Sequence, residues 1–310
     1  MRRVLDALSK RLDGKKAAAS TIYRKRAVVH NFLEYGVELG YFDSNPLKKI
    51  KKKGPKATEA IDPAYLPDHK RAQALLTAVG HQGKAGKHVV AYFACIYYAA
   101  MRPAEAADLH LANFIPPMKP GQWGEFRLSK SAPSVASCWT DSGTGRRESR
   151  QLKHRAEKDF RIVPCHPRLA ALIADHIDQF GIAPDGRLFR GARGGPLADS
   201  VTSQAWRSAH VAALSPEDFA AGIAQRPYDL RHDCVTGWLN AGVDPAQVAA
   251  WAGHSVAVLM RVYVGCIVGR DEIARKRIEA AFEGEEETAG DLSTLGEVRS
   301  TQDGAGESSG

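Results

Sequence analysis

The chain has 310 residues, 44% of them hydrophobic, which is enough for one sizeable core and a smaller module. It contains no run of about 18 uncharged apolar residues, so we expect no transmembrane helix, and its first residues lack the apolar stretch of a signal peptide. The five cysteines are scattered, odd in number and without a C-x-x-C pair. This pattern favours reduced thiols and a cytoplasmic location over a disulfide framework or a zinc site.

Charge is unevenly distributed along the chain, whose formal net charge is +8. Residues 1–56 carry fifteen lysines and arginines against five acidic residues, whereas residues 283–310 carry eight acidic residues against one arginine. The basic segment indicates a polyanion such as nucleic acid. A solvated lysine-rich face explains the same composition equally well.

The first predicted elements are helical. Residues 20–42 place apolar side chains at mostly helical spacing behind Ser20, a candidate N-cap, and Asn45-Pro46 ends the pattern. Residues 48–63 have no periodicity and are typical of a basic, flexible linker. Helices are then predicted over 69–80 and 86–100, and the second is apolar all round, which predicts a central position.

The pattern changes between residues 123 and 165. Short alternating runs at 125–130, 150–155 and 159–165 predict a small antiparallel sheet. Helical patterns return in five later segments. Asp244 is the predicted N-cap of one of them, Pro245 lies in its first turn and Gly253 follows its end. The five segments are 167–181, 199–214, 229–242, 244–253 and 270–284.

Three residues with chemical potential lie near the end of this series. Arg231 follows "YDL", His254 lies in "GHS" and Tyr263 lies in "RVYVG", at separations of 23 and 9 residues. Upstream, "MRPAEAADL" places Arg102 three residues before Glu105, and "LKHRAEKDFRIVP" contains Lys153. These boxes, in this order, resemble those of the tyrosine recombinases, the phage-integrase family. The wording "RPYDLRH…WLNAGV…WAGHSV" is most similar to integrases of actinobacterial mobile elements.

The resemblance covers about residues 20 to 282 and implies an architecture. The fold would be mainly α with a small antiparallel sheet, an α+β chain with a tyrosine-recombinase catalytic domain. That domain would span 66–282, after a short helical DNA-binding domain over 1–50 and a basic linker over 51–65. The segment 283–310, rich in Glu, Gly, Ser and Thr, would be a disordered acidic tail.

The resemblance also implies the chemistry. Arg102 and Arg231 would clamp the non-bridging phosphate oxygens with planar guanidinium forks, and His254 would be a third donor. Tyr263 would be the nucleophile that forms a 3′-phosphotyrosine, which keeps the bond energy for rejoining. Lys153 would protonate the leaving 5′-oxygen. Neither a metal ion nor another cofactor is implied.

Alternatives accompany several of these residues. Arg155 and Lys158 share the predicted hairpin with Lys153. Glu105 and His232 are expected to support the arginines rather than to react. Asp229 is expected only to cap its helix.

Two departures from the family pattern stand out. Tyr228 occupies the position of the family histidine in H-x-x-R, and a phenol donates a hydrogen bond to phosphate but is a poor proton acceptor near neutral pH. In addition, only some 50 residues precede the linker, where the family has about four helices. The module is either abbreviated or the chain starts late.

The sequence therefore predicts a site-specific DNA recombinase that integrates or excises a mobile element. Its partners would be double-stranded attachment-site DNA, three further copies in a tetramer on that DNA, and an accessory directionality factor, without any membrane. The stripe of Ile273, Ile278, Ala281 and Phe282 in the last predicted helix would dock on the neighbouring copy. The location would be cytoplasmic and nucleoid-associated. A catalytically impaired DNA-binding remnant and a type IB topoisomerase-like strand transferase are the alternatives.

Overall fold

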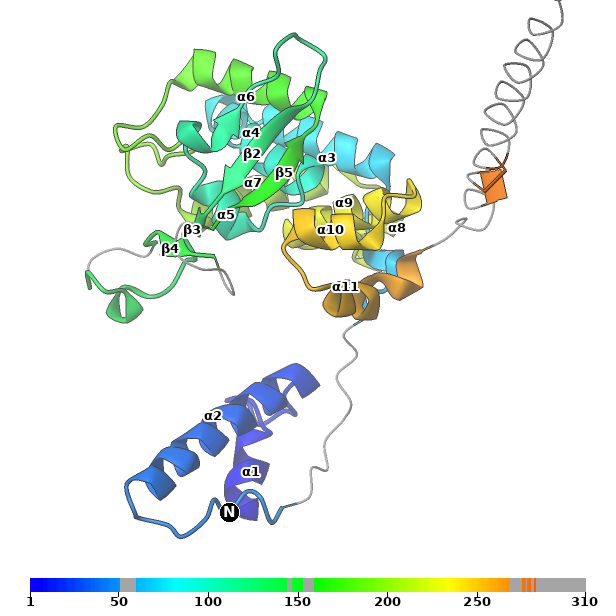
Figure 1. Cartoon of the computed structure of the whole chain (residues 1–310). Helices are drawn as coiled ribbons and strands as arrows, with labels where there is room; N and C mark the ends of the chain where they lie inside the picture. Colours follow the sequence, from blue (N-terminus) through cyan, green and yellow to red (C-terminus); the bar gives the residue numbers. More distant parts are fainter. Residues whose placement is uncertain are drawn as a thin grey trace, which may run out of the picture. The chain divides into compact units, whose positions relative to one another are not determined.

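The computed structural model describes residues 1–50, 60–143, 147–152 and 159–267, together with residues 275, 276, 278, 279 and 282 (Figure 1). The chain divides into two compact units, Met1–Glu59 and Ala60–Gly310. Its architecture is mostly helical with small antiparallel sheets, as predicted from the sequence. Short 3₁₀ turns lie at Pro63–Tyr65, Leu111–Asn113, Ser137–Trp139 and Val264–Cys266.

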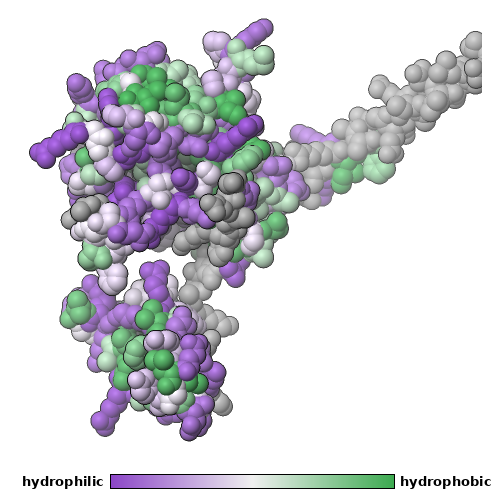
Figure 2. Space-filling view, turned by 60° about the vertical axis from the view of Figure 1, so that its left-hand side comes forward, coloured by the Kyte–Doolittle hydropathy of each residue, from purple (hydrophilic) through white to green (hydrophobic). Residues whose placement is uncertain are grey.

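The smaller unit contains α1 (Arg2–Leu8) and α2 (Ala19–Glu38). Helix α2 begins one residue before the predicted cap Ser20, and its N-cap is Ala18. After α2, the buried side chain of Asn45 donates to the carbonyl of His30 at 3.1 Å and accepts from the amide of Leu47 at 2.9 Å. The turn predicted at Asn45-Pro46 is thus fixed by hydrogen bonds. Figure 2 shows hydrophobic residues among hydrophilic ones on the surface of this unit.

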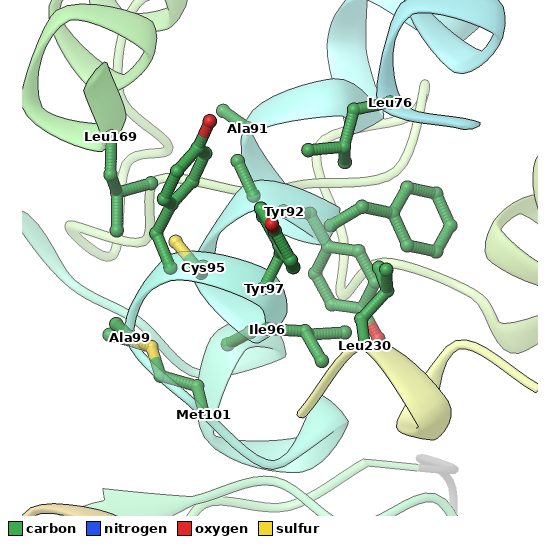
Figure 3. Close-up of a cluster of buried hydrophobic side chains, with 14 of the residues drawn as sticks. Leu76, Ala91, Tyr92, Cys95, Ile96, Tyr97, Ala99, Met101, Leu169 and Leu230 are labelled. Carbon is green, nitrogen blue, oxygen red and sulfur yellow. The ribbon is translucent and has the colours of Figure 1, made fainter. Parts of the chain in front are cut away.

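The core of the larger unit surrounds α4 (Gly83–Tyr98), which has neighbours on several sides. Ten residues of α4 are buried, so the prediction of a central helix is confirmed (Figure 3). Gly86 allows α4 to pack closely against the backbone of α3 (His69–Gly80), because a Cβ at this position would lie 2.0 Å from the carbonyl oxygen of Val79. The helices in contact with α4 are α3, α5 (Pro103–Ala107), α6 (Pro167–Phe180), α7 (Asp199–Ala213) and α9 (Tyr228–Asn240).

The predicted sheet is in fact two sheets. Strand β2 (Gly124–Leu128) pairs antiparallel with β1 (Phe114–Ile115) and β5 (Arg161–Cys165), and its alternate residues are buried. Strands β3 (Lys130–Ser131) and β4 (Arg150–Gln151) form a separate, more exposed pair. The two differ because only the first has an apolar face for the core. Lys153, Arg155 and Lys158 lie outside the described residues.

The last described helices are short. Helix α10 (Pro245–Ala252) has Asp244 as its N-cap and ends at Gly253 in the left-handed conformation, both as predicted. The sequence did not predict four helices as separate elements, namely α1, α5 (Pro103–Ala107), α8 (Pro216–Ala221) and α11 (Val256–Tyr263).

Like Ser20 at the start of α2, the predicted cap Asp229 was wrong. Helix α9 begins at Tyr228, and the carboxylate of Asp229 accepts from the amide of Arg226 at 2.9 Å from within the first turn.

In the described part of the chain, no single helix is long and apolar enough to cross a membrane. The stretch Pro245–Ala252 with Val256–Cys266 passes that test only as a pair bent by 100°.

Candidate active site

Arg231 lies in the first turn of α9 and is fully buried. Its Nη2 donates to the carbonyl of Ala252 at 2.6 Å, and its Nη1 donates to the carbonyl of Ala100. Ala100 has a φ of 45°, in the left-handed region that alanine rarely adopts, so the chain after α4 is strained where it presents this carbonyl. A guanidinium without water needs such acceptors, because an unpaired buried charge is strongly disfavoured.

Glu105 lies in α5 and connects two further arginines. Its carboxylate accepts from the backbone amide and the Nη1 of Arg102, both at 2.7 Å, and from Nη2 of Arg161 at 2.7 Å. Both partners also reach the end of α10, where Arg102 donates to the carbonyl of Gly253 at 2.7 Å and Arg161 to that of Ala252 at 3.1 Å. The free carbonyls at a helix C-terminus carry partial negative charge, which favours cations there.

Electrostatics keep Glu105 ionised despite its burial. Burial alone would raise the pKa of its carboxyl, but Arg161 and Arg102 outweigh that effect and lower the pKa to about 2. With Arg231 included, three guanidinium groups surround one carboxylate. The cluster therefore holds excess positive charge, which suits an anion.

His254 follows Gly253 directly and lies beside Arg231. Its Nε2 is 2.9 Å from Nη2 of Arg231. Burial, reinforced by Arg231 and Arg102, lowers the pKa of His254 to about 3, so the ring is neutral at neutral pH. Because a guanidinium can only donate, Nε2 accepts and Nδ1 carries the proton. This buried Nδ1 has no hydrogen-bond partner among the described residues, and neither has Nε of Arg231.

Tyr263 ends α11 and is completely buried in a secondary core with residues of α9 and α10. Its hydroxyl is 2.9 Å from Nδ1 of His232. Burial raises the pKa of Tyr263 above its usual range, and burial lowers the pKa of His232 to about 4. The ring of Tyr228 lies edge-on to His232, with centroids 4.8 Å apart, and 5.9 Å from the guanidinium carbon of Arg231.

A cleft of about 860 Å³ opens beside this cluster. The residues that line this cleft include Arg102, Arg161 and His254. Arg231 and Tyr263 do not line it. No group of three or more His, Cys, Asp or Glu residues able to hold a metal ion occurs among the described residues. The cleft thus offers guanidinium donors to an anion such as a phosphate, whereas the hydroxyl of Tyr263 is not among the groups that line it.

The structure brings together seven of the eight residues singled out from the sequence, and Lys153, the eighth, lies outside the described residues. Sequence reasoning missed Arg161. The signal was its parity in β5, because Arg161 alternates with Val163 and Cys165 and therefore shares their buried face. The seven residues are Arg102, Glu105, Tyr228, Arg231, His232, His254 and Tyr263.

No family model matches the chain. The chain is 31% identical to the tyrosine recombinase XerC of Mesorhizobium japonicum over 112 residues, which cover 36% of this chain and 34% of the relative. It is 28% identical to XerC of Methylobacterium sp. strain 4-46 over 132 residues, 42% of this chain and 37% of the relative. The chain thus spans only about a third of the length of these curated relatives.

Solved structures extend the likeness to most of the chain. The Tn1549 transposon integrase in complex with transposon right end DNA matches with a TM-score of 0.56 and 14% identity, over 84% of this chain and 80% of the integrase chain. XerH recombinase in its post-cleavage complex with palindromic difH substrate matches with a TM-score of 0.59 and 15% identity, over 90% and 72% of the two chains. These values show a shared fold. The local sequence similarity is thus to tyrosine recombinases, and the fold is shared with the Tn1549 integrase and XerH structures.

Proposed function

We propose that the protein is a site-specific DNA recombinase that cleaves and rejoins DNA strands through a covalent bond between Tyr263 and a 3′-phosphate. One observation carries the proposal. Arg231 touches His254, and Arg102 donates to the carbonyl next to that histidine, while the hydroxyl of Tyr263 lies 2.9 Å from His232 on the same helix as Arg231. The XerC relatives and the DNA complexes of Tn1549 integrase and XerH support the same function.

The residues divide the work. Arg102 and Arg231 would hold the non-bridging oxygens of the scissile phosphate, and Nδ1–H of His254 would supply a neutral donor. Oxygen Oη of Tyr263 would bond to phosphorus while the bond from phosphorus to the 5′-oxygen breaks. The departing oxygen needs a proton, for which Lys153 is our candidate.

The burial of Tyr263 implies a movement before reaction. Its side chain has no exposed surface, and the cleft beside Arg102 does not reach it. The residues that cover Tyr263 must therefore move when DNA binds, so that the phosphate reaches the hydroxyl in line while its contact with His232 is kept. Binding energy from DNA contacts would drive this step, as expected when substrate assembles a site.

Nicked duplexes tiled across the DNA that flanks the encoding gene would test the proposal. A nick close to the cleavage position lets the short fragment with the new 5′-hydroxyl diffuse away. Rejoining then cannot occur, so the covalent adduct accumulates. We expect an adduct with the unaltered protein, and Tyr263→Phe should abolish it while DNA affinity stays within about threefold, because only the nucleophilic oxygen is lost. Peptide mass spectrometry then locates the phosphotyrosine. An adduct in Tyr263→Phe would disprove the assignment.

The proposal also includes the DNA contacts, assembly, location and cofactor needs of the protein. The segment 1–50 would contact DNA, and the copies would assemble as a tetramer on two attachment sites, in the cytoplasm on the nucleoid. An accessory factor would set direction. Metal ions and ATP would not be needed, and the element would be of the actinobacterial type that the quoted segments resemble. The residues expected to carry the docking stripe, Ile273, Ile278, Ala281 and Phe282, belong to a segment that lies mostly outside the described residues.

A DNA-binding protein without cleavage activity is the second candidate. Tyr228 at the family histidine position and the buried Tyr263 favour it. The adduct assay separates the two candidates, because such a protein binds the same duplexes but forms no covalent complex. Tyr228→His provides a second test, because it restores the family histidine. If the protein is a recombinase, we expect this variant to keep or raise the cleavage rate.

A further inference from the structure

Among the described residues, the polar neighbour of the Tyr263 hydroxyl is the ring of His232, whose Nδ1 lies 2.9 Å away. The two rings have centroids 5.6 Å apart. His232 follows Arg231 on α9, so the helix that supplies a phosphate ligand also holds this imidazole against the nucleophile. The family histidine position, Tyr228, carries a phenol that packs edge-on to the same imidazole. A proton acceptor for Tyr263 is therefore present one helical turn from where the family places its histidine.

We infer that His232 is a catalytic residue that accepts the proton of Tyr263 as the tyrosine oxygen attacks the phosphate. This inference rests on the proposed function. The Oη–H bond of Tyr263 breaks, its proton moves to Nδ1 of His232, and the electron pair on Oη forms the bond to phosphorus. The bond from phosphorus to the 5′-oxygen breaks in the same reaction, and that oxygen takes a proton from the general acid. On rejoining, His232 returns its proton to Tyr263.

Burial keeps the ring of His232 neutral in the free protein. Its pKa of about 4 results from burial, and Asp229 opposes the effects of Arg231 and Arg226. Nδ1 can therefore accept a hydrogen bond when the proton resides on Nε2. Titratable and charged groups from its own helix and from both neighbouring segments face this ring, namely Arg226, Tyr228, Asp229, Arg231, His254 and Tyr263.

Proton transfer from a free phenol to such an imidazole is unfavourable, so it must accompany attack. A phenol oxygen becomes strongly acidic while it bonds to phosphorus, and the bound phosphate adds a negative charge that favours imidazolium. Arg231 lies near the rings of His232 and Tyr263. Because it binds the phosphate at that stage, its positive charge is compensated and opposes the imidazolium less. The transfer is thus matched to the transition state and absent from the resting protein.

His232→Asn separates proton transfer from hydrogen bonding. The asparagine oxygen can take the place of Nδ1 as an acceptor, but it cannot hold a proton. We expect single-turnover cleavage of the nicked duplex to fall on the order of a hundredfold or more at neutral pH. The log of the remaining rate should rise with pH in proportion to hydroxide, whereas the unaltered protein should show a plateau. His81→Asn, at the exposed C-cap of α3, is the matched control and should cleave at the original rate.

A more acidic nucleophile provides the decisive comparison. Fluorotyrosine at position 263 needs less help to lose its proton, so it should restore cleavage in His232→Asn by a larger factor than it changes the rate in the otherwise unaltered protein. Equal factors in both backgrounds, or an Asn variant within about threefold of the original rate, would overturn the inference.

Two further outcomes are distinct. If His232→Asn does not fold, the unaltered protein labelled with ¹⁵N in its histidine rings provides the test. Its NMR spectrum shows which ring nitrogen of His232 carries the proton, and the inference requires this nitrogen to be Nε2. A proton on Nδ1 would mean that His232 donates to Tyr263, and would overturn the inference. If the unaltered protein forms no adduct with any tiled duplex while it still binds DNA, the proposed function fails first, and the inference fails with it.

Discussion

At the scale of single residues, the site depends on how buried charge is compensated. Arg161 and Glu105 are almost inaccessible, and their paired contacts at 2.7 and 3.1 Å leave the carboxylate free to hold Arg102 as well. A buried ion pair contributes little net stability relative to an apolar pair, but removal of one partner is strongly destabilising. We therefore assign Arg161 a positioning role. It fixes Glu105, which fixes Arg102 at the cleft.

Replacement of Arg161 tests this role. Arg161→Met leaves Glu105 short of a partner and should reduce the free energy of unfolding by about 3 to 5 kcal/mol in urea denaturation. Glu105→Leu combined with Arg161→Met should recover most of that loss, since no buried charge is left over. Cleavage should stay low in the double variant, because Arg102 has lost its anchor. Recovery of cleavage together with stability would contradict the positioning role.

A surface pair supplies the control for that experiment. Arg71 binds the carboxylate of Asp218 at 2.7 Å, and its side chain is 38% exposed. Arg71→Met should therefore destabilise much less than Arg161→Met.

The pKa of Glu105, about 2, also predicts a pH effect. Because this pKa is lowered on folding, its stabilising contribution is complete above the unfolded value, about 4.3, and is lost as the pH falls towards 2.

At the scale of elements, the junction of α10 and α11 determines the geometry. Helix α10 ends where its carbonyls receive Arg102, Arg161 and Arg231, and the next residues supply His254 and the cap of α11. Gly253 makes the turn with a φ of 68°, and a Cβ there would lie 2.3 Å from Nη1 of Arg161 and 3.2 Å from Nη1 of Arg102. This glycine is required both for its backbone conformation and for the space it leaves.

Gly253→Ala should reduce both stability and cleavage. The left-handed conformation costs alanine about 1 to 2 kcal/mol, and the methyl group must displace a guanidinium. We expect the single-turnover cleavage rate to fall by about a hundredfold, the effect of losing one transition-state donor. Urea denaturation and the nicked-duplex assay measure the two effects separately.

Gly222→Ala is the matched control at the end of α8. Its φ is 77°, and a Cβ there would meet only the side chain of Gln225, 2.7 Å from its Nε2. This variant should lose similar backbone stability and retain cleavage, since Gln225 is exposed and can move. Equal loss of cleavage in both variants would show that strain alone, rather than the arginines, explains the effect.

At the scale of the whole molecule, charge separates the two ends of the chain. The segment 1–56 carries fifteen of the 43 lysines and arginines against only five acidic residues, and the segment 283–310 is acidic. Each phosphate contact made by a lysine or arginine releases counterions, so DNA affinity should fall steeply with salt. The smaller unit has few buried apolar side chains, so its charged surface is more open to substitution than the core around α4.

Neutralisation of exposed charge on the smaller unit tests its contact with DNA. Each lost phosphate contact should lower the slope of log K against log salt by about 0.9, so replacement by glutamine at five positions should lower it by up to about 4 to 5. Fluorescence anisotropy over a salt series measures the slope. The positions are Arg2, Arg3, Lys15, Lys16 and Arg24, all exposed.

An equal change of charge on the larger unit is the control. We expect a smaller change in slope for this set, because none of these side chains lines the cleft. Equal slopes in the two sets would mean that the smaller unit contributes only general charge. The control positions are Lys70, Lys84, Lys87, Lys119 and Arg207, also exposed.

The sequence by itself predicted the helical architecture and seven of the residues that the structure brings together. The separations of 23 and 9 residues between Arg231, His254 and Tyr263 are local in this part of the chain, because only α9, α10 and α11 lie between them. The all-round apolar composition of residues 86–100 likewise predicted the central α4, since such a helix has no solvent face.

Only the tertiary structure decided which distant groups meet. Arg161 reaches Glu105 across 56 residues because β5 pairs with β2 and packs against α10, and no local pattern encodes that contact. The pairing of His232 with Tyr263 likewise depends on the angle at which α11 returns to α9. Local propensity fixes where helices begin and end, whereas burial of charge is decided by packing, because each buried guanidinium requires acceptors that only the folded chain brings together.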